Sequence, residues 1–330
     1  MDHLIINNGD HHYNGKALFH GAIMNSGTII RSLDTTSKKA QQAFNDFSAA
    51  AGCSTEPPQN GQVLDCLRNV SFDKFVSAMN SLPNFMTSRS NDLAYLPRPD
   101  SSDSFFSVSP EVAIADGRFA RVPVIMGNQQ DEATVFSVDK GDLVNSTETL
   151  IDYMASWFPE TERSLVADLV KTYPDDPAAG LPANTGSQWE LYPQYKRLSA
   201  IQTDLTFLMG RREALSHMAS KVPAWSYLST YMHDFPQFGT YHISDLDTQF
   251  SLKVNEFAGN QMDAAYIHFV HHQDPNGRGD GHGCQTHWPK WSNKSLAMTN
   301  FGASNVTIMR DDFRWKSYEF WKKHSTELRQ

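Results

Sequence analysis

The sequence has little of several features that mark whole classes of protein. No apolar run approaches the roughly 20 residues that a helix needs to cross a bilayer, and no basic start with an apolar stretch stands near Met1. Acidic residues outnumber basic ones, 37 against 28, and the formal net charge is -9. Because phosphate binding needs clustered Lys and Arg, and no basic run occurs, we expect neither a nucleic-acid partner nor a transmembrane segment.

Internal repeats and low-complexity tracts are lacking too, whereas core-forming residues are plentiful, with 40% hydrophobic and 12% aromatic residues. Short apolar runs bounded by turn residues predict buried strands at 21–24, 122–126 and 224–229. Helical patterns occupy 38–51, 148–158, 161–173, 198–218, 254–270 and 311–324. Strands separated by helices predict an α/β sheet.

Two stretches contain residues suited to hydrolysis by a hydroxyl nucleophile. His242 stands in Phe-Gly-Thr-Tyr-His, and an imidazole that titrates near neutral pH can remove a proton and return it to a leaving alcohol. Glu132 follows the run 122–126 and offers the carboxylate that such a base needs to fix its tautomer. The neighbouring Asp131 competes for that role, and the residues alone do not separate the two carboxylates.

The nucleophile of such a triad is missing, because no Gly-x-Ser-x-Gly occurs anywhere in the chain. Ser26, in Met-Asn-Ser-Gly, follows a different predicted strand and lacks the flanking glycines. We therefore do not expect Ser26 to replace the missing serine.

Four ordered stretches together resemble a known family. They are Leu18-Phe-His-Gly-Ala-Ile-Met-Asn-Ser-Gly27, Tyr95-Leu-Pro-Arg-Pro-Asp100, Pro123-Val-Ile-Met-Gly-Asn-Gln-Gln-Asp-Glu132 and Phe238-Gly-Thr-Tyr-His242. They resemble the type-B carboxylesterase/lipase family, and within it the fungal lipases. The resemblance implies an α/β-hydrolase fold, a mixed and mostly parallel sheet with flanking helices, in which Ser, acid and His follow one another along the chain.

The resemblance also implies roles for individual residues. Glu132 is the expected acid, His242 the expected base, and Asp245 an acidic residue that supports the histidine through a buried hydrogen-bond network. From the residues alone, Asp245 fits equally well as a helix N-cap or a solvent-exposed loop acid.

The extent of the chain is interpreted through the same resemblance. The stretch 2–10 resembles the helix that follows the nucleophile, so we expect the serine, the Gly-rich oxyanion loop, the early strands and the lid to lie upstream of Met1. Residues 1–330 would then form a partial α/β-hydrolase domain with its early strands missing, inactive by itself, that hydrolyses lipophilic esters once completed. The alternative is a non-catalytic binding or interaction module descended from the esterase fold.

The cysteines and the glycosylation sequons indicate secretion through an oxidising compartment. Cys53 and Cys66 close a short polar loop and are either disulfide-bonded or both reduced; the family resemblance favours the bridge, which leaves Cys284 over. Sequons of the type Asn-x-Ser/Thr occur at Asn69, Asn145, Asn293 and Asn305. Together with the resemblance, these features predict a secreted glycoprotein, although the sequence contains no signal peptide.

A metal site is the remaining hypothesis. His and Cys residues gather near the C-terminal third of the chain, at His268, His271, His272, His282, Cys284 and His287. Their spacing matches no common zinc pattern, so we expect no metal and no cofactor.

Overall fold

The computed structural model describes residues 1–54, 60–84, 87–89, 91–251, 254–277 and 284–330. Within these residues the main sheet has five strands in the order β3-β4-β5-β6-β7. The strands are β3 (Ala22–Asn25), β4 (Val124–Gln129), β5 (Ala224–Ser229), β6 (Ala297–Phe301) and β7 (Val306–Arg310). The first four run parallel and β7 pairs antiparallel with β6, so the expected mixed, mostly parallel sheet is confirmed.

Helices connect the parallel strands, as the alternating pattern predicted. The longer ones are α1 (Lys38–Ala50), α2 (Asn60–Asn69), α3 (Phe72–Asn80), α4 (Pro110–Ala115), α6 (Thr147–Ala155), α7 (Arg163–Lys171), α8 (Tyr195–Thr203), α9 (Met209–Met218), α11 (Glu256–His272) and α12 (Trp315–Lys323). Shorter elements are η1 (Asp2–Leu4), η2 (Ile6–Gly9), β1 (His12–Tyr13), β2 (Lys16–Ala17), α5 (Thr134–Ser137), η3 (Pro177–Ala179), η4 (Asp204–Leu208), α10 (Ser244–Leu246) and η5 (Asp247–Ser251).

Two sequence expectations need correction. The stretch 2–10 is not an α-helix but two 3-10 turns, because Asn7 and Asn8 take positive φ angles of 50° and 57°. The pattern at 198–218 belongs to a longer helix from 195 to 218, in which η4 is a π-helical turn between α8 and α9.

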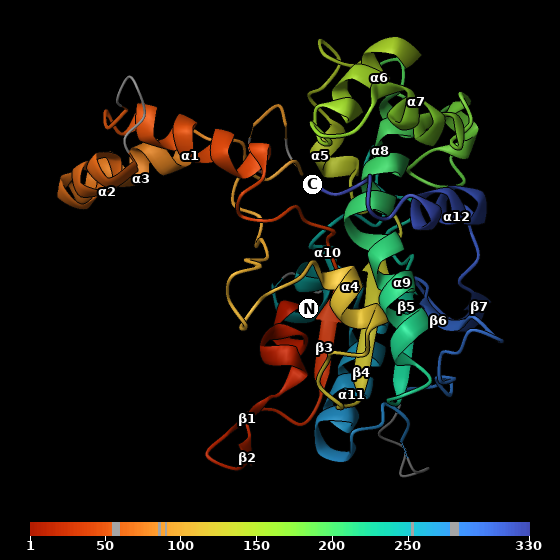
Figure 1. Cartoon of the computed structure of the whole chain (residues 1–330). Helices are drawn as coiled ribbons and strands as arrows, with labels where there is room; N and C mark the ends of the chain where they lie inside the picture. Colours follow the sequence, from red (N-terminus) through yellow and green to blue (C-terminus); the bar gives the residue numbers. More distant parts are fainter. Residues whose placement is uncertain (55–59, 85–86, 90, 252–253, 278–283) are drawn as a thin grey trace.

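The sheet is covered on both faces (Figure 1). Helices α4 and α9 pack on one face through residues such as Ile114 and Leu215, against Val124 and Met126 of β4. Helix α11 packs on the other face through residues such as Met262 and Phe269. Every residue of β4 and β5 is buried, in agreement with the apolar runs 122–126 and 224–229 that predicted these strands.

Helices α1, α2 and α3 form an arm that stands to one side of the sheet (Figure 1). Its small core consists of Ala51, Cys53, Val63 and Ala78. The predicted disulfide is confirmed, because Cys53 and Cys66 are bonded with their Cα atoms 5.6 Å apart. Residues 55–59 of the loop between them lie outside the described residues.

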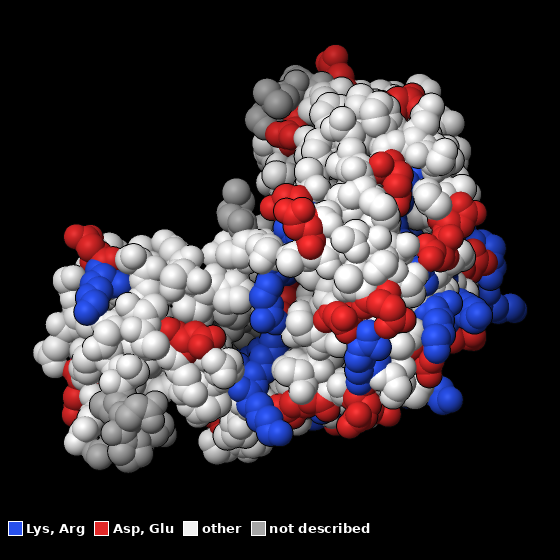
Figure 2. Space-filling view, turned by 90° about the horizontal axis from the view of Figure 1, so that it is seen from above, with Lys and Arg blue, Asp and Glu red and all other residues white. Residues whose placement is uncertain are grey.

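The surface agrees with the charge pattern of the sequence. Figure 2 shows acidic and basic side chains spread over both the arm and the body on the face in view. All four sequon asparagines, Asn69, Asn145, Asn293 and Asn305, are exposed. Among the described residues, no helix combines the length and the apolarity that a membrane span requires.

Candidate active site

Glu132 lies three residues after the end of β4, at the carboxyl edge of the sheet, and its side chain is fully buried. Its Oε2 is 2.6 Å from Nδ1 of His242. Its Oε1 accepts hydrogen bonds from the backbone N–H of Gln129 at 2.8 Å, from Oγ of Ser26 at 2.5 Å and from Nδ2 of Asn128 at 3.3 Å. Because these three donors face Oε1 and the imidazole faces Oε2, the carboxylate is held in one orientation.

His242 approaches from the loop that follows β5. A carboxylate only accepts hydrogen bonds, so the short contact requires Nδ1 to carry the proton and leaves Nε2 as the nitrogen that can take up another. The imidazole also packs against two aromatic rings, with centroids 4.8 Å from Phe207 and 5.4 Å from Phe136. The side chain remains about a quarter exposed, at 26%. A base with a fixed tautomer, an apolar wall and an open side is suited to proton transfer at a substrate.

The structure separates the two adjacent carboxylates that the sequence left open. Asp131 is also buried, but its Oδ1 accepts the backbone N–H of Ala183 and its Oδ2 that of Thr240, both at 2.9 Å. Burial raises the pKa of Asp131 to about 7, although these two donors oppose the shift. Asp131 therefore ties two loops together, while Glu132 is the carboxylate that reaches His242.

Comparisons with known proteins show the family of the chain. The model of the carboxylesterase family matches residues 11–321. The chain belongs to the carboxylesterase family. Among curated relatives, the secreted triacylglycerol lipase LIP1 of Gibberella zeae is 37% identical over 97% of this chain and 53% of its own length. Secreted lipase 1 of Botryotinia fuckeliana is 36% identical over 97% of this chain and 55% of its own length.

Solved structures support the fold of this carboxylesterase-family chain. EstA of Aspergillus niger superposes with a TM-score of 0.75 at 18% identity, over 100% of this chain and 62% of its own. A PNB esterase superposes with a TM-score of 0.68 at 20% identity, over 93% of this chain and 58% of its own. Both likenesses show the α/β-hydrolase fold. The chain spans about half the length of the curated relatives it matches.

Asp245 lies near Glu132 and His242, the pair that the family resemblance expects it to support. It sits inside α10 and is buried, while Ile243 occupies the N-cap position, so the two alternative interpretations, an N-cap and a solvent-exposed acid, are both wrong. Burial raises the pKa of Asp245, the charge of Glu132 raises it further and His242 lowers it. Asp245 thus lies within electrostatic reach of both residues of the pair.

Ser26, which the sequence analysis considered only as a replacement nucleophile, belongs to the site in another way. It follows β3 with a positive φ of 57°, is buried, and directs its hydroxyl to Oε1 of Glu132. This oxygen is the one that does not contact His242, so Ser26 supports the carboxylate rather than acting as a nucleophile toward the base. The available signal was its position directly after a predicted strand, since β3 is parallel to β4 and ends at the same sheet edge as Glu132; that strand was expected to be buried, but only Met24 of its four residues is.

The π-helical turn η4 provides one side of the site. It places Phe207 against the ring of His242. It also places Asp204 against Arg314, with 2.7 Å between Nε and Oδ2, and against the hydroxyl of Tyr173 at 3.0 Å. Single π-helical turns are frequent at functional sites, because they change the direction in which the following side chains point.

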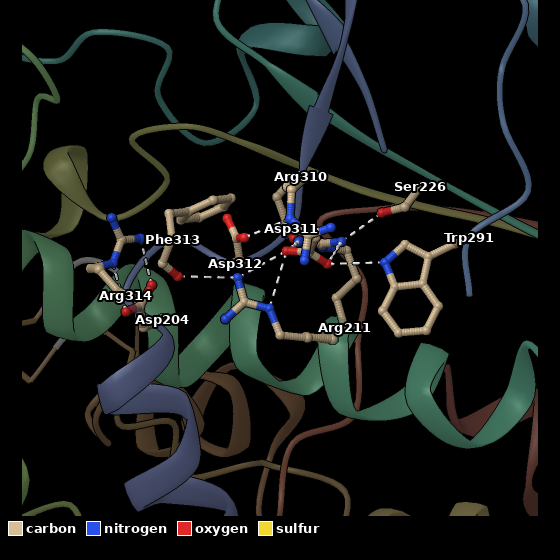
Figure 3. A network of polar contacts seen from close by, with 11 residues as sticks. Asp204, Arg211, Ser226, Trp291, Arg310, Asp311, Asp312, Phe313 and Arg314 are labelled. Carbon is tan, nitrogen blue, oxygen red and sulfur yellow. Dashed lines mark hydrogen bonds and ion pairs between the residues drawn. The ribbon is translucent and has the colours of Figure 1, made fainter. Parts of the chain in front are cut away.

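Figure 3 shows a buried ion cluster, which is linked to Glu132 through Asn128. Arg211 and Arg212, consecutive on α9, both bind the carboxylate of Asp311, which follows β7. Burial alone would raise the pKa of Asp311, but the two guanidinium groups outweigh it and hold that pKa below its ordinary value. The cluster joins the end of the β6–β7 hairpin to the helix that covers β4.

The arrangement of the described residues does not support the hypothesis of a metal site. In the part of the chain that the structure describes, no group of three or more His, Cys, Asp or Glu is arranged to hold a metal ion. Nδ1 of His268 instead lies 2.8 Å from the backbone carbonyl oxygen of Asp274. His282 lies outside the described residues.

Proposed function

We propose that this chain carries the acid and the base of a serine carboxylic-ester hydrolase that cleaves acylglycerols or other lipophilic esters. Glu132 orients the imidazole of His242 and stabilises its charged form. His242 takes the proton of a serine hydroxyl at Nε2 and then delivers it to the leaving alcohol, so that an acyl-enzyme forms and is later hydrolysed. Asp245 supports the pair electrostatically.

The observation that carries this proposal is the contact between Nδ1 of His242 and Oε2 of the buried Glu132 at 2.6 Å. The buried carboxylate has a partner on each oxygen, since Ser26 and Gln129 donate to Oε1 and His242 contacts Oε2. This arrangement fixes the imidazole tautomer that general-base catalysis requires.

The serine and the oxyanion donors belong, in this proposal, to a segment outside these 330 residues. The sequence contains no Gly-x-Ser-x-Gly, and Ser26 is engaged with the far oxygen of Glu132. Residues 1–330 are accordingly proposed to be part of a larger α/β-hydrolase domain that does not hydrolyse esters by itself.

The substrate class and the route of export rest on similarity and on local features. Relatives named as triacylglycerol lipase and secreted lipase support a lipophilic ester and an extracellular location. The aromatic wall of Phe136 and Phe207 beside His242 suits an apolar substrate. The Cys53–Cys66 disulfide and the exposed sequon asparagines suit a secreted glycoprotein.

The test is to read the genomic DNA upstream of the codon for Met1, express the longer protein if that DNA encodes a Gly-x-Ser-x-Gly segment in frame or across an intron, and measure ester hydrolysis. Glu132→Gln and His242→Gln should each lower kcat by about 1,000-fold or more, because each breaks the triad. His268→Gln is the matched control, since His268 is bonded to a backbone carbonyl away from the site.

Each alternative has its own result. Upstream DNA without such a segment would overturn the enzyme proposal and favour the binding-module alternative. Hydrolysis of a short-chain nitrophenyl ester by the 330-residue chain alone, abolished in His242→Ala, would show that the nucleophile lies within it.

A further inference from the structure

The buried ion cluster around Asp311 distinguishes two arginines that have the same main partner. Arg211 binds Asp311 through Nη1 and Nη2, each at 2.9 Å. Arg212 binds the same carboxylate through Nε at 3.1 Å and Nη2 at 2.9 Å. All three side chains are at most 1% exposed, so both guanidinium groups depend on Asp311 for their compensation.

Only Arg211 extends the cluster toward the candidate active site. Its Nε donates to Oδ1 of Asn128 at 2.7 Å, and its Nη1 donates to Oγ of Ser226 at 2.5 Å. Arg212 instead contacts the backbone carbonyl of Phe313 on the opposite side. The two neighbouring arginines therefore share an anchor and differ in what they reach.

The contact with Arg211 decides which way the amide of Asn128 points. An amide can rotate to exchange its oxygen and its nitrogen, but a guanidinium only donates, so the oxygen must face Arg211. The NH₂ group is then directed to Oε1 of Glu132, at 3.3 Å. Without that constraint, a rotated amide would set its oxygen against the carboxylate and repel it.

We propose that Arg211 and Asn128 are positioning residues, which hold the Glu132 carboxylate in the orientation that presents Oε2 to His242. This inference rests on the proposed function of the Glu132–His242 pair. Two guanidinium groups on one carboxylate leave the cluster with a net positive charge, which attracts the Glu132 carboxylate across the amide.

A purely structural role is the competing explanation, since the cluster also fastens the β6–β7 hairpin to α9. Two pairs of variants separate the explanations. Asn128→Asp replaces the donor that faces Glu132 with an acceptor, and its matched control is Asn300→Asp, on β6, where Oδ1 accepts from Thr230 at 3.0 Å. Arg211→Lys releases the amide, and its control is Arg212→Lys, which weakens the same bond to Asp311 without touching Asn128.

The first readout is the proton NMR signal of the His242 Nδ1–H in the 330-residue chain. A proton shared at 2.6 Å with a carboxylate is deshielded and protected from exchange, and it is assigned by its loss in His242→Gln. We expect an upfield shift or loss of this signal in Asn128→Asp and Arg211→Lys, and no change in Arg212→Lys and Asn300→Asp. Urea unfolding of all four variants measures stability in parallel.

Two results overturn different claims. A wild-type chain without a His242 Nδ1–H signal would contradict the proposed function itself. A wild-type signal that is unchanged in Asn128→Asp and Arg211→Lys, or that follows stability equally in both arginine variants, would leave the proposed function intact and overturn the positioning role. In the longer enzyme the same two variants should lower kcat by about tenfold, with little change in KM.

Discussion

The body of the molecule and its arm are stabilised in opposite ways. In the body, the essential contacts join residues far apart in sequence, such as Arg211 and Asp311, which are 100 residues apart. In the arm, the main tie is a disulfide between residues 13 apart, and among the described residues its core has four buried side chains, one of them Cys53 of that disulfide. The comparison teaches that the site is built where long-range packing fixes each polar group, whereas the arm is held together locally.

The largest effect is expected from breaking the long-range tie. Asp311→Asn removes the negative charge that Arg211 and Arg212 share and leaves two buried guanidinium groups uncompensated, so the free energy of unfolding should fall by about 3–5 kcal/mol. The adjacent Asp312→Asn is the control, because that carboxylate is exposed and pairs with the exposed Arg310. Urea unfolding followed by Trp fluorescence measures both; equal losses would contradict the distinction.

Breaking the Cys53–Cys66 disulfide should destabilise the protein less, and only within the arm. Cys53→Ser opens the disulfide, which should lower the stability of the arm by about 3 kcal/mol because the unfolded arm gains freedom. Limited proteolysis should then cut within residues 38–80 while the body stays intact. Cys284→Ser, which leaves the bridge in place, is the control. Parallel loss of body and arm would show that the two regions are not separately stabilised.

A pH-dependent effect of intermediate size is expected from Asp131, which joins two loops of the site. The raised pKa of Asp131, about 7, means that the folded state retains a proton which the unfolded state loses near pH 4. The unfolded state thus binds fewer protons between these values, so stability should fall as pH rises from about 4 to 7. Asp131→Asn should flatten that slope in urea titrations at several pH values, and an unchanged slope would assign it to other groups.

The smallest effect is expected on the surface of the arm. Phe72 is 80% exposed on α3, so Phe72→Ser should change the free energy of unfolding by less than about 0.5 kcal/mol. Trp157→Ser, at a fully buried position of the body, is the contrasting variant and should be strongly destabilising. A large loss from Phe72→Ser would mean that this ring is covered in solution.

Regular patterns in the sequence were enough to predict the central strands and most helices. The run 224–229 coincides with β5, and the predicted helix 148–158 corresponds to α6, which Ser146 caps with Thr149 completing a capping box. The hairpin of β6 and β7 was not predicted. Most residues of β7 are exposed, and the strand has no continuous apolar run. Predictions therefore succeeded where a segment carries a short apolar run, as β5 does, or a regular helical pattern, as α6 does.

The site was only partly predictable for a physical reason. Its acid and base come from stretches with a recognisable order, but Asp131 and Glu132 are adjacent and equally polar, so only the three-dimensional path of the loop separates them. Ser26 reaches Glu132 from the neighbouring strand β3, and Asn128 is oriented by Arg211, which is 83 residues away on α9. Such contacts depend on how strands neighbour each other, and one-dimensional periodicity does not record that.

Because of the π-helical turn η4, the number of residues in the helix from 195 to 218 is itself fixed by the contacts at its two ends. A regular α-helix advances by about 100° per residue, so deleting one residue between 204 and 208 would restore a uniform winding and turn one end of the helix against the other by about that angle. Phe207 and Arg211 could then no longer face their separate partners at once. Insertions and deletions within this helix should thus be far less tolerated than substitutions, a bias that random length variation of the segment would reveal.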